Sequence, residues 1–269
     1  MNRIKAVFSK QNKALISELV RTDFKLRYQG SVLGYAWSLL RPLLLFLILY
    51  VVFVKFLKIG GDIPHYPVYL LFGMVLWNFF VEMTMQSLGS IVGRGDLIRK
   101  IKIPRWIIVL STSLAAVINL LLNMIVIAVF MVLGHVPVSF SVLYLPLLIV
   151  EIYILALGVS LFLSAAFVKY RDLNYIWEVV LQAGFYATPV LYPLSRITNA
   201  TIQKIILLNP MGQALQDARY SLITHDTLTS QKVFKGDWHE YIAYAIVFII
   251  LIIGALYFKS QSKYFAENI

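Results

Sequence analysis

The sequence lacks cysteine and is poor in charged residues. Without cysteine the chain has no disulfide, no thiolate nucleophile and no Cys-ligated zinc or iron–sulfur centre. Charged side chains make up 14% of the 269 residues and hydrophobic ones 60%, whereas soluble proteins have roughly 25% and 45–50%. A soluble monomer of this size could not bury that much apolar surface, so the composition predicts an integral membrane protein.

The charges that are present are mostly basic. Lys and Arg number 24 and Asp and Glu 13, which gives a net charge of +11. Because the apolar mass needs a non-aqueous environment, we expect membrane lipids around the chain and no nucleic-acid partner. The four histidines fall in predicted loops without a His-x3-His pair. We therefore expect no metal site.

Long stretches without charge predict an all-α protein with six transmembrane helices. A crossing needs roughly 20 mostly apolar residues, and the 45 residues of 106–150 contain no Asp, Glu, Lys or Arg. The Gly-His-Val-Pro turn at 134–137 divides that stretch into two crossings. The other four crossings are expected at 34–56, 67–92, 173–192 and 241–258.

The distribution of basic residues predicts an N-in/C-in orientation. Lys and Arg are retained on the cytoplasmic side, and this orientation places 17 of them inside and 7 outside. Residues 1–33 form a predicted cytoplasmic segment with an amphipathic interface helix, or else a solvated basic leader, and contain no apolar core of a cleavable signal. Residues 34–269 form the predicted six-helix domain, with a short cytoplasmic helix in the loop 93–105.

Several motifs together resemble one protein family. Residues 22–42 read TDFKLRYQGSVLGYAWSLLRP, and Asp-Leu-Ile-Arg-Lys at 96–100, Tyr-Arg-Asp at 170–172 and Leu-Asn-Pro at 208–210 follow in order. This pattern resembles the permeases of ATP-binding-cassette (ABC) exporters for polysaccharides and polyol phosphates, which include O-antigen, teichoic-acid, capsule and cell-wall rhamnan permeases. The resemblance covers essentially the whole chain and implies a bacterial cytoplasmic (inner) membrane protein.

The resemblance also implies partners. It suggests a homodimer that works with two copies of a separate nucleotide-binding ATPase. No Gly-Lys dipeptide occurs in the chain, so the phosphate-binding Gly-x4-Gly-Lys-Ser/Thr loop is absent. ATP and Mg would be bound by the ATPase, and we expect no cofactor and no catalytic residue here. The residues expected to couple the two subunits are Asp96, Leu97, Ile98, Arg99, Lys100, Ile101, Pro104, Arg171 and Asp172.

Polar residues inside two predicted crossings suggest a path for substrate. Asn, Glu and Gln recur at four-residue steps at 78–86 and again at 174–182, which places each trio on one helix face. Such ladders either line a glycan conduit or hold helices together. Aromatic rings offer broad contact to sugar C–H faces. The conduit candidates are Tyr35, Trp37, Trp77, Asn78, Glu82, Gln86, Glu178, Gln182, Phe185 and Tyr186, whereas Asn119, Asn123 and Glu151 are assigned to packing.

The region 194–240 predicts two short amphipathic helices that meet at Asn209 and Pro210. Proline ends one helix and readily starts the next. We expect re-entrant helices that gate the outer exit between crossings five and six, or else a loop helix resting on lipid.

These predictions converge on a permease subunit that exports a lipid-linked polysaccharide or polyol-phosphate polymer. An ion-coupled secondary transporter and a membrane glycosyltransferase are the alternatives. The first would need an ion site that works without an ATPase, and the second would need substrate-binding acids or bases in ordered loops.

Overall fold

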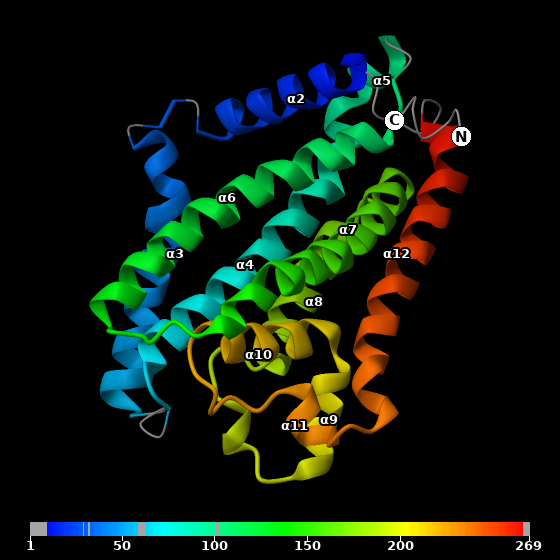
Figure 1. The fold of residues 1–269 in the computed structure, drawn as a ribbon. Helices are drawn as coiled ribbons and strands as arrows, with labels where there is room; N and C mark the ends of the chain where they lie inside the picture. Colours follow the sequence, from blue (N-terminus) through cyan, green and yellow to red (C-terminus); the bar gives the residue numbers. More distant parts are fainter. Residues whose placement is uncertain (1–9, 29, 32, 59–62, 101–102, 266–269) are drawn as a thin grey trace.

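The chain is helical wherever the structure describes it. The computed structural model describes residues 10–28, 30–31, 33–58, 63–100 and 103–265, and no β-strand occurs among them. Figure 1 shows long helices running side by side, with α2 (Lys10–Tyr28) lying across one end and α10 (Pro210–Leu222) near the other. These are called the α2 end and the α10 end below. The all-α prediction is confirmed.

Five helical stretches are long and apolar enough to cross a membrane, which makes the chain a multi-pass membrane protein. They are Trp37–Phe56, formed by α3 (Trp37–Tyr50) and the π-helix η2 (Val51–Phe56); α4 (Tyr66–Ser90); α6 (Trp106–Leu133); Phe140–Lys169, which ends in α7 (Leu145–Lys169); and Trp238–Tyr264, which contains α12 (Ile242–Gln261).

The remaining predicted crossing, 173–192, is a shorter helix. α8 (Leu173–Ala187) has 15 residues, or about 22 Å at 1.5 Å per residue, against about 30 Å of hydrocarbon. It ends because Thr188 precedes a proline, and such a residue favours extended backbone. Thr188 has φ −89° and ψ 140°. Five of the six expected crossings therefore coincide with helices of sufficient length.

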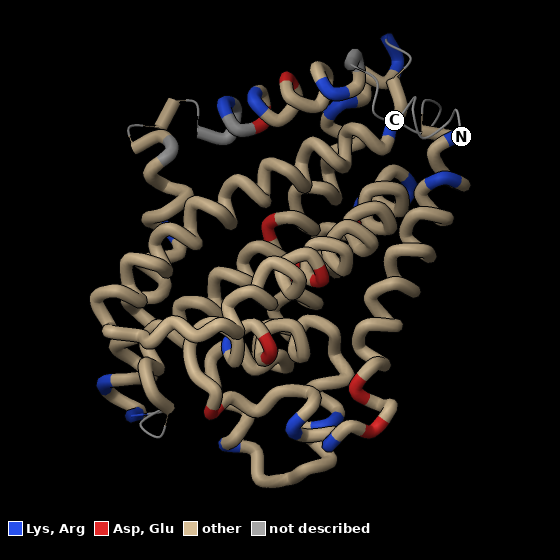
Figure 2. Tube along the Cα trace, in the orientation of Figure 1, with Lys and Arg blue, Asp and Glu red and all other residues tan. Residues whose placement is uncertain are grey.

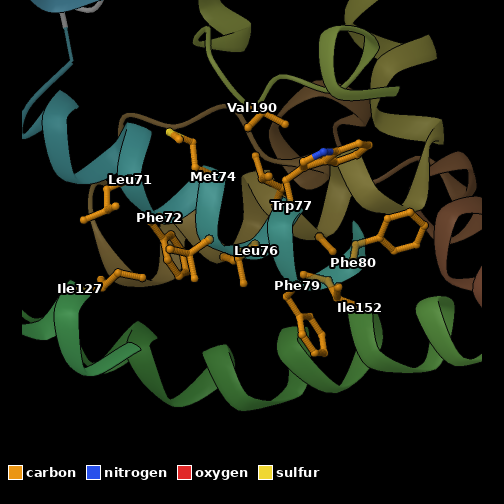
Figure 3. Close-up of a cluster of buried hydrophobic side chains, with 14 of the residues drawn as sticks. Leu71, Phe72, Met74, Leu76, Trp77, Phe79, Phe80, Ile127, Ile152 and Val190 are labelled. Atoms are coloured by element: carbon orange, nitrogen blue, oxygen red, sulfur yellow. The ribbon is translucent and has the colours of Figure 1, made fainter. Parts of the chain in front are cut away.

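α4 is the central helix of the protein. Within its most apolar window 78% of the residues are buried, against 6% for Trp37–Phe56 and 22% for Trp238–Tyr264. Figure 3 shows its side chains gathered with Ile127 of α6, Ile152 of α7 and Val190. Protein therefore surrounds α4, while α3 and α12 present apolar side chains outward, as helices in contact with lipid or another subunit do.

Two glycines allow α7 and α12 to approach closely. A Cβ added to Gly158 would lie 2.7 Å from the Cα of Leu251, and one added to Gly254 would lie 2.9 Å from the carbonyl carbon of Gly158. Small residues are the usual means by which membrane helices bring their backbones together. This pair fixes α12 against the helix that supports α4.

At the α10 end, two short helices meet at Asn209 and Pro210. The first of them, α9 (Ala200–Leu208), ends just before Asn209. The second, α10, begins at Pro210, where the missing N–H of proline costs no helical hydrogen bond. The Oδ1 of Asn209 caps α10 by accepting from the N–H of Met211 at 3.1 Å. Most residues of α10 are buried, because this helix packs against α4, α7 and α12.

Candidate functional site

A cavity of about 870 Å³ lies among α3, α4, α6 and α8. Its wall mixes apolar side chains with amides, carboxylates and one guanidinium. The lining residues are Ser31, Trp37, Ser38, Arg41, Pro42, Leu45, Asn78, Val81, Glu82, Met85, Gln86, Asn119, Glu178 and Leu181. Polar groups are expensive in a membrane unless they have partners or water. A polar cavity of this size inside an apolar helical protein is therefore the strongest candidate for a substrate site.

The polar ladder of α4 faces this cavity. Asn78, Glu82 and Gln86 all line it, as their four-residue spacing requires. The Oε1 of Glu82 accepts a hydrogen bond from the Nε2 of Gln86 at 2.8 Å and another from the Nδ2 of Asn119 on α6. The ladder thus lines the cavity and also joins α4 to α6, so the two interpretations of the sequence are not exclusive.

α8 contributes one member of its ladder to the cavity. Glu178 lines the wall and accepts a hydrogen bond from the Nδ2 of Asn174 at 2.8 Å, while Gln182 is exposed away from the lining. Leu181 is the second lining residue of α8. The two ladders have the same residue spacing, but only the α4 ladder lines the cavity with all three of its members.

The aromatic candidates divide into three groups. Trp37 lines the cavity and is 41% exposed. Trp77 and Phe185 instead pack on one another, with ring centroids 6.0 Å apart, and Trp77 belongs to the hydrophobic core. Tyr186 is exposed and does not line the cavity, and the side chain of Tyr35 lies outside the described part of the structure. Only Trp37 among the described aromatics is brought to the cavity.

Two asparagines of α6 behave differently. Asn119, which was assigned to packing, joins α6 to Glu82 of α4 by a hydrogen bond and also lines the cavity. Asn123 donates to the backbone oxygens of Asn119, at 2.8 Å, and Ser38, at 3.5 Å. The Ser38 oxygen lacks its helical donor because Pro42 has no N–H. Asn123 therefore serves packing, as expected, by compensating a proline in α3.

The expected coupling residues lie at the α2 end. Asp96, Leu97, Ile98, Arg99 and Lys100 form most of α5 (Gly95–Lys100), Pro104 follows it, and Ile101 is outside the described residues. Ile98 is only 9% exposed and packs with Ile108 and Phe258, so part of the apolar side of this helix is buried within the chain. Asp96, Arg99, Lys100 and Pro104 are exposed, and Leu97 is half-buried.

An ion pair links α5 to α2. Arg94 ends the 3-10 helix η3 (Val92–Arg94), which leads into α5, and its guanidinium pairs with the carboxylate of Asp23 in α2. The same guanidinium donates to the Oγ of Ser111 at 2.9 Å. Arg171 and Asp172, in the turn between α7 and α8, are both exposed. Figure 2 shows the concentration of basic residues at this end of the protein.

A buried arginine, Arg219, stabilises the α10 end and was not identified from the sequence. It has no exposed surface and donates to three backbone oxygens: Nε to Tyr69 at 3.1 Å, Nη1 to Pro189 at 2.5 Å and Nη2 to Val190 at 2.6 Å. Its guanidinium also lies 3.7 Å from the ring centroid of Tyr69. Arg219 therefore fixes α10 to α4 and to the segment after α8.

The guanidinium of Arg219 fits against α4 because position 73 of that helix is a glycine. Gly73 of α4 leaves the room that the guanidinium occupies, since an added Cβ would lie 2.7 Å from its Cζ. Arg219 also shares a helix face with Leu215 and Ile223, four residues away on either side. Both are buried. This position within an apolar face is the one sequence signal that could have identified it.

α10 also carries a cluster of hydrogen-bonded polar side chains around Asp217. Asp217 accepts from Gln213 at 2.7 Å and from the hydroxyl of Ser230 at 3.2 Å, and Gln213 donates to Tyr244 of α12 at 3.0 Å. Burial raises the pKa of the Asp217 carboxyl. Glu151 of α7 is 7% exposed and interacts electrostatically with Asp217. Among the described residues, no three His, Cys, Asp or Glu side chains are placed to hold a metal ion.

Comparison with known proteins gives the family of the chain. Residues 14–223 match the family model described as ABC-2 type transporter. The chain is 30% identical over 262 residues to the O-antigen export system permease protein RfbA of Myxococcus xanthus, with 96% of each chain covered. It is 31% identical over 256 residues to a protein of the same name from Klebsiella pneumoniae, with 94% of each covered. These matches confirm the resemblance seen in the sequence motifs, and the chain belongs to the ABC-2 type transporter family.

Proposed function

We propose that this chain is the membrane permease subunit of an ATP-driven exporter for a lipid-linked polysaccharide. The family match supports an ABC exporter, and two similar proteins that are named O-antigen export permeases favour an O-antigen-type glycan over a polyol-phosphate polymer. The bacterial cytoplasmic membrane is the proposed location, because the proposed exporter moves its glycan from the cytoplasmic to the outer face.

The cavity is the observation that supports this function best. A glycan presents many hydroxyl groups, each of which both donates and accepts hydrogen bonds. The wall offers two amides and one carboxylate in a row along α4, next to the ring of Trp37 and the apolar side chains of Leu45 and Met85. Many weak contacts of this kind suit a polymer that must slide. A catalytic step is not part of the proposal.

In this proposal the α2 end faces the cytoplasm, as the surplus of Lys and Arg there favours. Both termini then lie inside, α8 serves as the sixth crossing, and α9 and α10 form an outer gate around Asn209 and Pro210. Two copies of the chain would assemble with two ATPase subunits, which bind ATP and Mg.

Contact with the ATPase is assigned to the exposed residues of α5 and to the turn at Arg171 and Asp172. The ion pair between Arg94 and Asp23 would carry movement of α5 to α2 as a rigid unit. A substitution at Leu97, which is half-buried, tests this contact with less damage to the fold than one at Ile98, which is buried. We expect Leu97→Asp to reduce export severalfold while hydrolysis of ATP continues.

The test of the function is reconstitution. The chain is purified with the ATPase encoded beside it, placed in vesicles with lipid-linked glycan, and assayed for glycan that reaches the opposite leaflet. We expect export only with ATP and with an ATPase that can hydrolyse it. Export should continue when ionophores collapse the ion gradients. Export that persists with a hydrolysis-deficient ATPase, or that stops when ion gradients are collapsed, would instead identify an ion-coupled secondary transporter.

The polar ladder has its own test. Glu82→Gln keeps an oxygen that can accept from Gln86 and Asn119, so we expect export to stay within about twofold of the unmodified protein. Glu82→Leu removes the acceptor and leaves two amides without it, and we expect a loss of tenfold or more. Glu178→Leu, on α8, is the matched control, because it leaves one amide, that of Asn174, near the surface. Equal effects of both leucine variants would contradict a special role for the α4 ladder.

A further inference from the structure

The cavity contains one charged group that belongs to neither polar ladder. Arg41 of α3 lines it together with Glu82 and Glu178. Both glutamates accept hydrogen bonds from amide side chains. Within the described part of the chain, the guanidinium of Arg41 has no hydrogen bond and no ion pair, and the side chain is exposed toward the cavity. Among these three charges, Arg41 is therefore the one that the protein leaves available to a ligand.

The position of Arg41 along α3 suits an anion at the membrane surface. Trp37, Arg41 and Leu45 recur at four-residue steps and all line the cavity. Trp residues favour the membrane–water interface. Arg41 lies one turn further along the helix, or about 6 Å by the rise of 1.5 Å per residue. The long side chain of Arg41 can extend back toward the interface, where lipid phosphates lie, and Arg binds phosphate through two parallel hydrogen bonds.

The surroundings of Arg41 match three chemical parts of one ligand. From Leu44 onward, α3 presents a row of exposed apolar side chains, including Leu45, Leu47 and Ile48, on which a hydrocarbon chain can lie. On the other side of Arg41 the α4 ladder offers hydrogen bonds to sugar hydroxyls. An amphiphile that consists of a hydrocarbon chain, a phosphate or diphosphate and a sugar would place its phosphate group at Arg41, between the apolar surface of α3 and the polar ladder of α4.

We infer that Arg41 is the binding group for the phosphate or diphosphate that joins the glycan to its lipid carrier. This inference rests on the proposed function and adds the chemical feature by which the cavity selects its substrate. The apolar surface of α3 receives the carrier chain, and the polar wall of α4 receives the first sugars. The site therefore selects a lipid-linked glycan over a free one.

The test measures binding of a long-chain prenyl diphosphate to the purified permease–ATPase complex. We compare Arg41→Ala, Arg41→Lys and, as a control that also removes a positive charge at the α2 end, Lys263→Ala. Size-exclusion profiles establish folding, and Arg41→Gln replaces the alanine variant if that one aggregates. We expect at least tenfold weaker binding for Arg41→Ala, partial recovery for Arg41→Lys, and unchanged binding for Lys263→Ala.

Two further probes identify the source of the anion. A neutral prenol of the same length should bind at least tenfold less tightly than the diphosphate, and inorganic diphosphate should compete only at far higher concentration. Inorganic diphosphate that binds as tightly as the lipid would overturn the inference in favour of a free-anion site. Unchanged lipid binding by Arg41→Ala in a complex that still exports would overturn it while leaving the proposed function intact. An unmodified complex that shows no ATP-dependent export would instead contradict the proposed function.

Discussion

The contact between Gly73 and Arg219 allows a strict test of the structure, because α4 contains a second glycine for comparison. Gly73→Ala places a methyl group 2.7 Å from the Cζ of Arg219 and closer still to its Nη2, whereas nonpolar carbons at rest lie about 3.5–4.0 Å apart. Gly89→Ala introduces the same methyl group in the same helix with no atom within 4 Å. The two variants differ only in what the methyl group meets.

The size of the effect follows from the hydrogen bonds that must break. Alanine is favoured over glycine in a helix by about 0.8–1 kcal/mol, and this gain applies to both variants. Moving the guanidinium by about 1 Å to relieve the overlap breaks its bonds to the carbonyls of Pro189 and Val190, at about 1.5–3 kcal/mol each. We therefore expect Gly73→Ala to be destabilised by about 2–5 kcal/mol and Gly89→Ala to be neutral or slightly stabilised.

The assay is the midpoint of thermal unfolding of the detergent-purified protein. At about 2–4 °C per kcal/mol, Gly73→Ala should lower the midpoint by roughly 5 °C or more. In an Arg219→Lys background the guanidinium is gone, so Gly73→Ala should cost much less than in the unmodified protein. Equal midpoints for Gly73→Ala and Gly89→Ala, or an unchanged cost in the Arg219→Lys background, would refute the reasoning.

Three other predictions concern the remaining contacts. Gly254→Ala should destabilise the packing of α12 on α7 by about 1–3 kcal/mol, because its methyl group meets the backbone of Gly158; an unchanged unfolding midpoint would contradict this packing. Asp23→Asn removes the negative charge that pairs with Arg94, so export should fall severalfold per ATP hydrolysed, and an unchanged ratio would exclude the ion pair from coupling. Burial raises the pKa of Asp217 above its ordinary value of 3.8. The native state then holds a proton that the unfolded chain has released, so the free energy of unfolding should fall as the pH rises from 3.8 to the raised pKa. Asp217→Asn should remove that slope, and an identical pH profile in both proteins would show that this carboxyl is not responsible.

The membrane-spanning helices were the most predictable part of the fold. Their signal is the length of an apolar run, which depends on the chain alone and not on neighbouring segments. α8 departs from that pattern because its run contains Pro189 and is followed by Pro193, and Thr188 adopts the extended backbone that a following proline favours. The two prolines were visible in the sequence, but hydropathy gives them little weight.

The residues that line the cavity were predictable from the sequence only where they lie together on one helix. Helical spacing places Asn78, Glu82 and Gln86 on one face, and the structure agrees. Periodicity does not say which face meets a cavity and which meets the core, so Trp77 was assigned to a conduit although it packs in the core. Asn119 reaches Glu82 from another helix, and such a contact depends on tertiary packing.

Arg219 shows why buried polar contacts escape sequence analysis. Its partners are the backbone oxygens of Tyr69, Pro189 and Val190, and backbone groups are the same in every residue. Arg41 likewise entered the sequence analysis only as part of the motif at 22–42 and as one of the basic residues placed inside. Its distinction is the lack of a partner within the described structure, which a sequence cannot reveal.

The central claim, that the glycan passes the cavity of this permease, is tested most directly by photocrosslinking. A photoreactive amino acid replaces Met85, which lines the cavity, or Ile252, which is 56% exposed on α12 away from it. In export-competent complexes supplied with ATP, we expect glycan crosslinked at position 85 and none at position 252. A complex that exports normally yet yields no glycan adduct at position 85, or equal adducts at both positions, would contradict the account.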